Sequence, residues 1–112
     1  MGYYTYFKLQ LEPENFDIIK EIRNNDPDSD FAWALDDDGN AADSAKWYEW
    51  EEDMQRISKN YPNYIFHLSG EGEENDDLWK ADFWNGHIQI RRAIVTYPPF
   101  DPTFGGNRRE AN

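Results

Sequence analysis

Residues 81–90 read ADFWNGHIQI and contain the strongest structural signal in the chain. Its central Asn85-Gly86 pair is typical of a two-residue hairpin turn, because both residues tolerate the positive φ angles of a type I′ turn. Such a turn fixes the strand register, so four opposed pairs are predicted: Trp84 with His87, Phe83 with Ile88, Asp82 with Gln89, and Ala81 with Ile90. Since opposed residues share a face, we expect Ala81, Phe83, Ile88 and Ile90 to face the core.

The remaining elements are predicted outward from this hairpin, whose strands are expected over 78–84 and 87–97. Alternating apolar residues predict further strands over 3–11, 31–35 and 64–69. A short amphipathic helix is expected over 14–24. A second helix is expected from an N-cap at Asp43 or Ser44 to Asn60, because apolar residues recur there at helical spacing and form a core-facing stripe: Trp47, Trp50, Met54, Ile57 and Tyr61.

These elements predict an α+β fold in a single domain over 1–99. The order strand, helix, strand, helix, strand, strand, strand gives a five-stranded mixed or antiparallel sheet with two helices packed on one face. Arg91-Arg92 interrupts the last strand, which indicates a bulge or an exposed edge. Residues 100–112 are expected to form a loosely held tail, docked through Phe100 and Phe104.

Composition bounds the class of protein. The chain of 112 residues has no Cys, which excludes disulfides, thiolate metal sites and a Cys nucleophile. No apolar run approaches the roughly 20 residues that a membrane-spanning helix needs. The N-terminus lacks the basic and apolar regions of a signal peptide. We therefore expect a soluble cytoplasmic protein.

Charge is concentrated in the middle of the chain. The net charge is −12, yet residues 26–77 contain sixteen acidic and three basic residues, a net −13. Such a field attracts basic partners and repels nucleic acids and membrane surfaces, although acidic surfaces also simply keep small proteins soluble. The predicted contact residues for a basic partner protein lie in three acidic groups: Asp36, Asp37 and Asp38; Glu49, Glu52 and Asp53; and Glu71, Glu73, Glu74, Asp76 and Asp77.

Motifs for metal binding and catalysis are weak. Aligning Gly39 with the glycine of a calcium loop leaves Ala34 and Ala45 at the two anchoring ligand positions, so this loop type is rejected and no cofactor is predicted. No nucleophile or zinc-protease motif occurs. His67 and Glu71 could still converge as the centre of a small hydrolase or metal-dependent enzyme, and this alternative stays open.

Direct nucleic-acid binding is not expected. Tyr4, Tyr6 and Tyr64 could form a stacking platform on a small sheet. Phosphate contacts, however, need clustered Lys and Arg, and the chain offers only Arg91-Arg92 and Arg108-Arg109.

A longer segment, 46–86, resembles small uncharacterised proteins of bacteriophages and mobile elements. The shared pattern is a K-W-Y-type helix, a break at a Pro, a Gly-Glu-Gly-Glu-Glu run, an Asp-x-Trp and an aromatic strand that ends at a turn glycine. The matching residues are Lys46, Trp47, Tyr48, Glu51, Asp53, Pro62, Gly70, Glu71, Gly72, Glu73, Glu74, Asp77, Trp79, Phe83 and Gly86. The resemblance implies a phage-type setting and no mechanism.

The sequence thus favours a non-enzymatic interaction protein, which in that setting would be a phage-encoded inhibitor of a host defence or nucleic-acid-binding protein. Duplex DNA carries about one charge per 1.7 Å of axis, and crowded carboxylates can imitate that density. The host-cell cytoplasm would then be its location. A second alternative is a structural subunit that assembles through the edge of the strand over 3–11.

Overall fold

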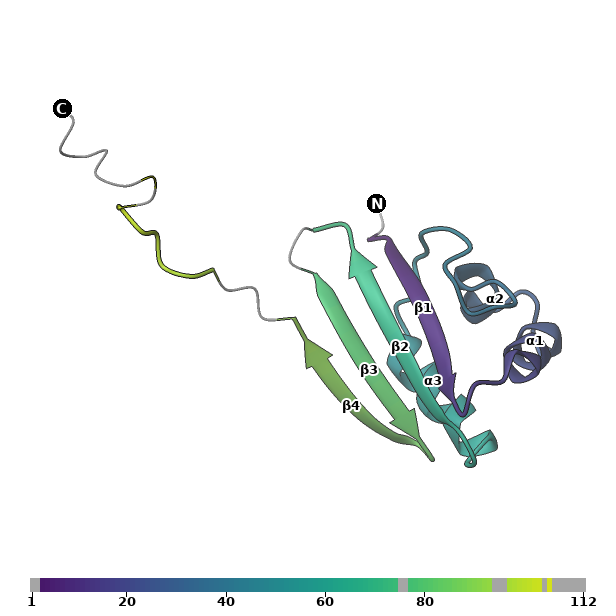
Figure 1. The fold of residues 1–112 in the computed structure, drawn as a ribbon. Coiled ribbons are helices and arrows are strands. Elements are labelled where there is room, and N and C mark those ends of the chain that lie inside the picture. The colour runs from purple at the N-terminus through teal and green to yellow at the C-terminus, as the bar shows by residue number, and fades with distance from the viewer. Residues whose placement is uncertain (1–2, 75–76, 94–96, 104, 106–112) are drawn as a thin grey trace.

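A computed structural model describes residues 3–74, 77–93, 97–103 and 105. The fold is α+β, with one four-stranded antiparallel sheet in the order β1-β2-β3-β4 (Figure 1). Along the chain the elements are β1 (Thr5–Glu12), α1 (Phe16–Asn25), α2 (Asp30–Ala34), α3 (Trp50–Asn60), β2 (Ile65–Gly72), β3 (Leu78–Trp84) and β4 (His87–Arg92).

The predicted turn and strand register of the hairpin are confirmed. β3 and β4 pair in the expected register, from Trp84 opposite His87 to Ala81 opposite Ile90. Asn85 and Gly86 both have positive φ, 47° and 82°, as a type I′ turn requires. The pairing continues without a bulge to Arg92, so of the two explanations offered for Arg91-Arg92 the exposed edge is correct.

One side of the sheet holds the core. The burial of β1 alternates strictly, with Thr5, Phe7, Leu9 and Leu11 inside. Phe66, Leu68, Trp79, Ala81 and Phe83 continue this inner face over β2 and β3, and the buried residues of all three helices join the same cluster: Ile19, Ile22, Phe31, Ala34, Met54 and Ile57. Ile88 packs against the core as expected, whereas Ile90, near the end of the edge strand, is 39% exposed.

The strand predicted over 31–35 is wrong, and so is the five-strand count. This segment forms α2, whose N-cap Ser29 accepts a hydrogen bond from the Ala32 amide at 3.2 Å. Large and small residues alternate here, but Trp33 is 68% exposed while Phe31 and Leu35, four residues apart, are buried. That spacing is helical, so the alternation in size did not reflect alternation in burial.

The second predicted helix begins later than expected. α3 begins at Trp50, not after Asp43 or Ser44, and its N-cap Glu49 makes no side-chain capping bond. The preceding segment bonds instead to the edge of β1, where Thr5 and Ala45 exchange two 2.9 Å hydrogen bonds and the Leu9 amide donates to Gly39 at 2.7 Å. An irregular segment thus takes the place of the fifth strand. Trp47 is nevertheless buried, as predicted.

Smaller differences concern element ends. α1 begins at Phe16 behind the N-cap Asn15, two residues later than predicted, and β2 runs three residues further, to Gly72. β4 ends at Arg92, so the strand predicted over 87–97 is too long: Ala93 and Tyr97 are not in a strand, and residues 94–96 lie outside the described part. In the tail, Tyr97 and Phe100 are largely exposed, and the predicted docking residue Phe104 also lies outside the described part.

Candidate functional site on the outer face of the sheet

The side chains that alternate with the core residues form a second surface, which we call the outer face. In the part of the chain that the structure describes, no helix packs on it; α3 crosses behind the opposite side (Figure 1). The outer face consists of Tyr6, Lys8, Gln10 and Glu12 of β1, Ile65, His67, Ser69 and Glu71 of β2, Leu78, Lys80, Asp82 and Trp84 of β3, and His87, Gln89 and Arg91 of β4.

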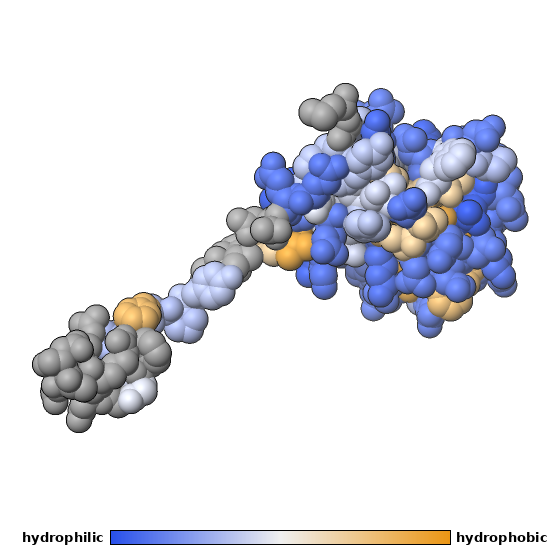
Figure 2. All heavy atoms as spheres, turned by 90° about the horizontal axis from the view of Figure 1, so that it is seen from above, coloured by the Kyte–Doolittle hydropathy of each residue, from blue (hydrophilic) through white to orange (hydrophobic). Residues whose placement is uncertain are grey.

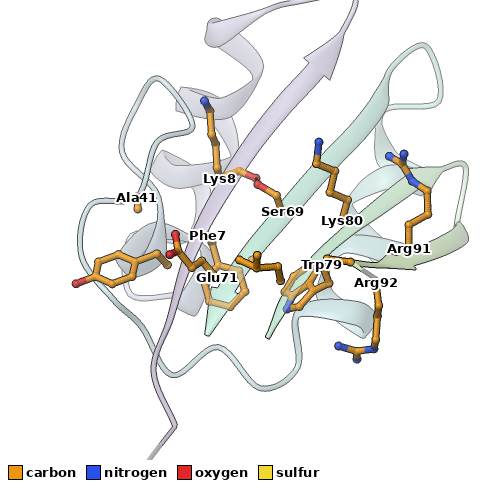
Figure 3. A pocket seen from close by; sticks show the side chains of 13 residues that line it. Phe7, Lys8, Ala41, Ser69, Glu71, Trp79, Lys80, Arg91 and Arg92 are labelled. Carbon is orange, nitrogen blue, oxygen red and sulfur yellow. The ribbon is translucent and has the colours of Figure 1, made fainter. Parts of the chain in front are cut away.

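Basic side chains lie in the middle of this face. The pairing of all four strands aligns Lys8, Ser69, Lys80 and Arg91 in one row, which we call the central row (Figure 3). Arg91 donates two 3.0 Å hydrogen bonds to Asp82. Within the described residues, neither lysine has an ion-pair partner. The central row therefore exposes two uncompensated positive charges in a strongly acidic protein.

Two adjoining cavities open over the central row. The larger, about 590 Å³, extends from the row to Tyr6 and Leu78 (Figure 3). The smaller, about 340 Å³, extends the other way to Gln10 and His67. Both are lined by all four residues of the central row. A volume of this size is typical of small-molecule sites.

His67 is the centre of a charge network next to the row. Its Nδ1 lies 2.7 Å from Asp82 Oδ1, and its Nε2 lies 3.1 Å from Glu12 Oε2. Burial opposes the charge of His67, but the hydrogen bonds to Asp82 and Glu12 outweigh it and raise the pKa of His67 above its ordinary value. Burial alone would raise the pKa of Asp82, because it disfavours the charged carboxylate. The hydrogen bonds from His67 and Arg91 together outweigh burial, so the pKa of Asp82 is lowered overall.

This network does not contain the predicted His67–Glu71 centre. Glu71 lies in another row of the face, paired with Tyr6 and Leu78, and the two nitrogens of His67 are occupied by other carboxylates. Among the described residues, no group of three or more His, Asp or Glu side chains could hold a metal ion.

The predicted contact residues Glu71, Glu73, Glu74 and Asp77 lie where the end of β2 meets the start of β1, and we call this end of the sheet the acidic end. Glu49 follows Tyr48, whose hydroxyl reaches the same end. Tyr3 links its segments: the Tyr48 hydroxyl accepts from the Tyr3 amide at 2.8 Å, and the Tyr3 hydroxyl donates to Asp77 at 2.5 Å. The Tyr4 amide donates to Glu73 at 2.9 Å. Figure 2 looks onto this end and shows a mostly hydrophilic surface.

The other predicted contact residues have separate roles or places. Asp36 accepts from the amides of Asp38 and Asn40 in a turn beside β1, and Asp37 pairs with Arg23. Asp53 accepts from the Trp47 indole at 2.8 Å. Glu52 is exposed on α3, and Asp76 lies outside the described residues. The acidic surface is therefore interrupted rather than continuous.

The central row was missed at the level of sequence. The hairpin register predicts Lys80 opposite Arg91 once it is extended by one pair beyond Ala81 and Ile90. Lys8 and Ser69, 61 positions apart, come together only through the pairing of β1 with β2.

Comparisons with protein-family models, curated proteins and solved structures found no match. The phage or mobile-element setting thus stays a prediction. Within the described residues, no helix has both the length and the apolar character to cross a membrane.

Proposed function

We propose that this chain is a non-enzymatic interaction protein that binds a basic partner protein through the acidic end. The observation that supports this proposal is the convergence at the N-terminus of β1 of carboxylates that are far apart in sequence. Glu49 comes from the start of α3, and Glu71, Glu73 and Glu74 come from β2 and the loop after it. None of these four has an ion-pair partner within the described residues.

The partner's binding surface would be cationic. In the setting that the sequence resemblance implies, the partner is a host defence or nucleic-acid-binding protein, and the acidic end occupies its groove in place of DNA. Long-range attraction by the net charge of −12 would speed association, and salt would weaken it. Asp77 is a supporting residue in this proposal, because it pairs with Tyr3 and lies 3.7 Å from Arg92.

Affinity capture from host lysate, followed by mass spectrometry, tests the proposal. The acidic-end variant Glu71→Gln/Glu73→Gln/Glu74→Gln is compared with the control variant Glu14→Gln/Asp26→Asn/Asp28→Asn, which removes the same charge from exposed residues around α1. The wild type and the control should capture the same basic protein at low salt and lose it at high salt, and the acidic-end variant should capture less. If the amount of captured protein changes neither with salt nor with the acidic-end substitutions, the proposal is refuted.

A second candidate, an enzyme centred on His67 and Glu71, has less support, because His67 bonds to Glu12 and Asp82 instead of Glu71. Assembly through the edge of β1 is likewise less favoured, since residues 39–45 already bond to that edge. The edge of β4 remains the better candidate for pairing between copies.

A further inference from the structure

We propose that the outer face is a second binding site, which takes a small organic oxyanion with a flat apolar body. Its negative group would lie over Ser69, between Lys8 and Lys80. Its apolar body would lie in the larger cavity, against Tyr6 and Leu78. This site differs from the acidic end in charge and in the ligand that it would take, although Glu71 belongs to both, so the inference goes beyond the proposed function.

The spacing of the central row suits one anion. Ser69 pairs with Lys8 on one side and with Lys80 on the other. Neighbouring strands lie about 4.8 Å apart, so the two lysine backbones are about 10 Å apart across Ser69. Two extended lysine side chains can close that span around a single oxyanion. The Ser69 hydroxyl donates to the Lys8 carbonyl at 3.5 Å, and it would have to turn from that carbonyl to donate to the anion.

The cations are also placed at some cost to the fold. Lys80 lies directly opposite Arg91, and like charges in directly opposed strand positions are destabilising. Arg91 is drawn toward Asp82, which leaves the ammonium groups of Lys8 and Lys80 as the available charges. An anion bound between Lys8 and Lys80 would offset the charge of Lys80 and so weaken its repulsion with Arg91.

The larger cavity explains why the ligand needs an apolar body. Tyr6 is 54% exposed and Leu78 39% exposed, and both line the cavity of about 590 Å³ beside the central row. The main opposing group is Glu71, which lies between Tyr6 and Leu78 in the neighbouring row. In Figure 3 its carboxylate lies on the side away from Lys80 and Arg91, and Glu71 itself lines the cavity, so its charge opposes the anion and weakens the site.

The test is a titration of the full chain with 2-naphthoate, followed by amide chemical shifts and calorimetry. The uncharged amide 2-naphthamide has nearly the same shape and serves as the ligand control. Naphthoate should bind at least tenfold more tightly than naphthamide and should shift the amides of Tyr6, Ser69 and Lys80. Equal binding of the two compounds, shifts centred elsewhere, or displacement by inorganic phosphate at the same concentration as naphthoate would overturn the proposal.

Variants locate the charges. Lys8→Gln and Lys80→Gln should each weaken naphthoate binding about tenfold, the usual effect of losing one charge-assisted hydrogen bond. Lys20→Gln removes an equal charge from the exposed side of α1 and should change binding less than twofold. If Lys20→Gln weakens binding as much as Lys80→Gln, the effect is one of net charge and the site is refuted.

Glu71→Gln separates this site from the acidic end. It should tighten naphthoate binding, because it removes the opposing charge, whereas the proposed function requires that it weaken capture of a basic partner. Each proposal can therefore fail while the other stands. Weaker naphthoate binding in Glu71→Gln would overturn the placement of the anion beside Ser69.

Discussion

The inner and outer faces of the sheet are built from alternate residues of the same four strands, yet they differ in almost every property. The inner face is almost entirely apolar and covered by helices, with Phe66, Ala81 and Phe83 completely buried. The outer face carries charged and polar groups and two adjoining cavities. Burial limits the inner positions to residues that pack in the core, whereas the outer positions can hold residues that bind a ligand or partner.

The largest change in the free energy of unfolding is expected from a substitution on the inner face. Phe83→Ala removes a ring with no exposed surface that packs edge-on against Trp50, with ring centroids 6.2 Å apart. The lost contacts and the cavity left behind should lower the free energy of unfolding by about 3–5 kcal/mol, measured by urea denaturation. The control Gln89→Ala, on the outer face of β4, should stay within about 0.5 kcal/mol. A loss below about 1 kcal/mol for Phe83→Ala would contradict the division of the two faces.

A smaller effect is expected from His67 on the outer face. The raised pKa of His67 means that its stabilising contribution is complete below its ordinary value of 6.5 and is lost as pH rises through the folded value. The lowered pKa of Asp82 means that its contribution is complete above its ordinary value of 3.8 and is lost as pH falls through the folded value. Their joint contribution is therefore greatest between about 3.8 and 6.5.

The variant His67→Gln measures this contribution. Because the His67 side chain is 38% exposed, solvent screening limits the difference from wild type to about 0.5–1 kcal/mol at pH 5.5. The difference should shrink toward zero at pH 9, as followed by urea denaturation at several pH values. Gln89→Ala changes no titratable group, so its difference from wild type should not vary in this way. A His67→Gln difference that grows with pH would contradict the assigned network.

Local signals allowed one half of the sheet to be predicted from sequence. The Asn85-Gly86 turn specifies the register of β3 and β4, because Asn and Gly adopt its positive φ angles at little cost. The alternation of β1 predicted its buried face for a similar reason. α2 was missed because a five-residue helix has too few residues to show a period.

The central row was harder to predict, because it depends on contacts between distant segments. No local signal sets the register of β1 against β2; it follows from the burial of Phe7, Leu9 and Leu11 opposite Gly70, Leu68 and Phe66. The acidic residues, in contrast, were evident from composition, but composition could not show that Asp37, Asp53 and Asp77 have partners of their own.

The smallest predicted effect tests the outer face when it is empty. Lys80→Gln removes the like-charge opposition to Arg91, so it should raise the free energy of unfolding by about 0.3 kcal/mol, a shift of about 1–2 °C in Tm. The gain should decrease in high salt. Lys8→Gln is the control, since Lys8 lies opposite Ser69 and not opposite a cation.

With naphthoate present, the difference in the free energy of unfolding between Lys80→Gln and wild type should reverse its sign, because the wild type then gains the stability of the bound ligand and Lys80→Gln gains less. If Lys80→Gln lowers the free energy of unfolding in the absence of ligand, then Lys80 stabilises the fold, and its position no longer supports a role in binding.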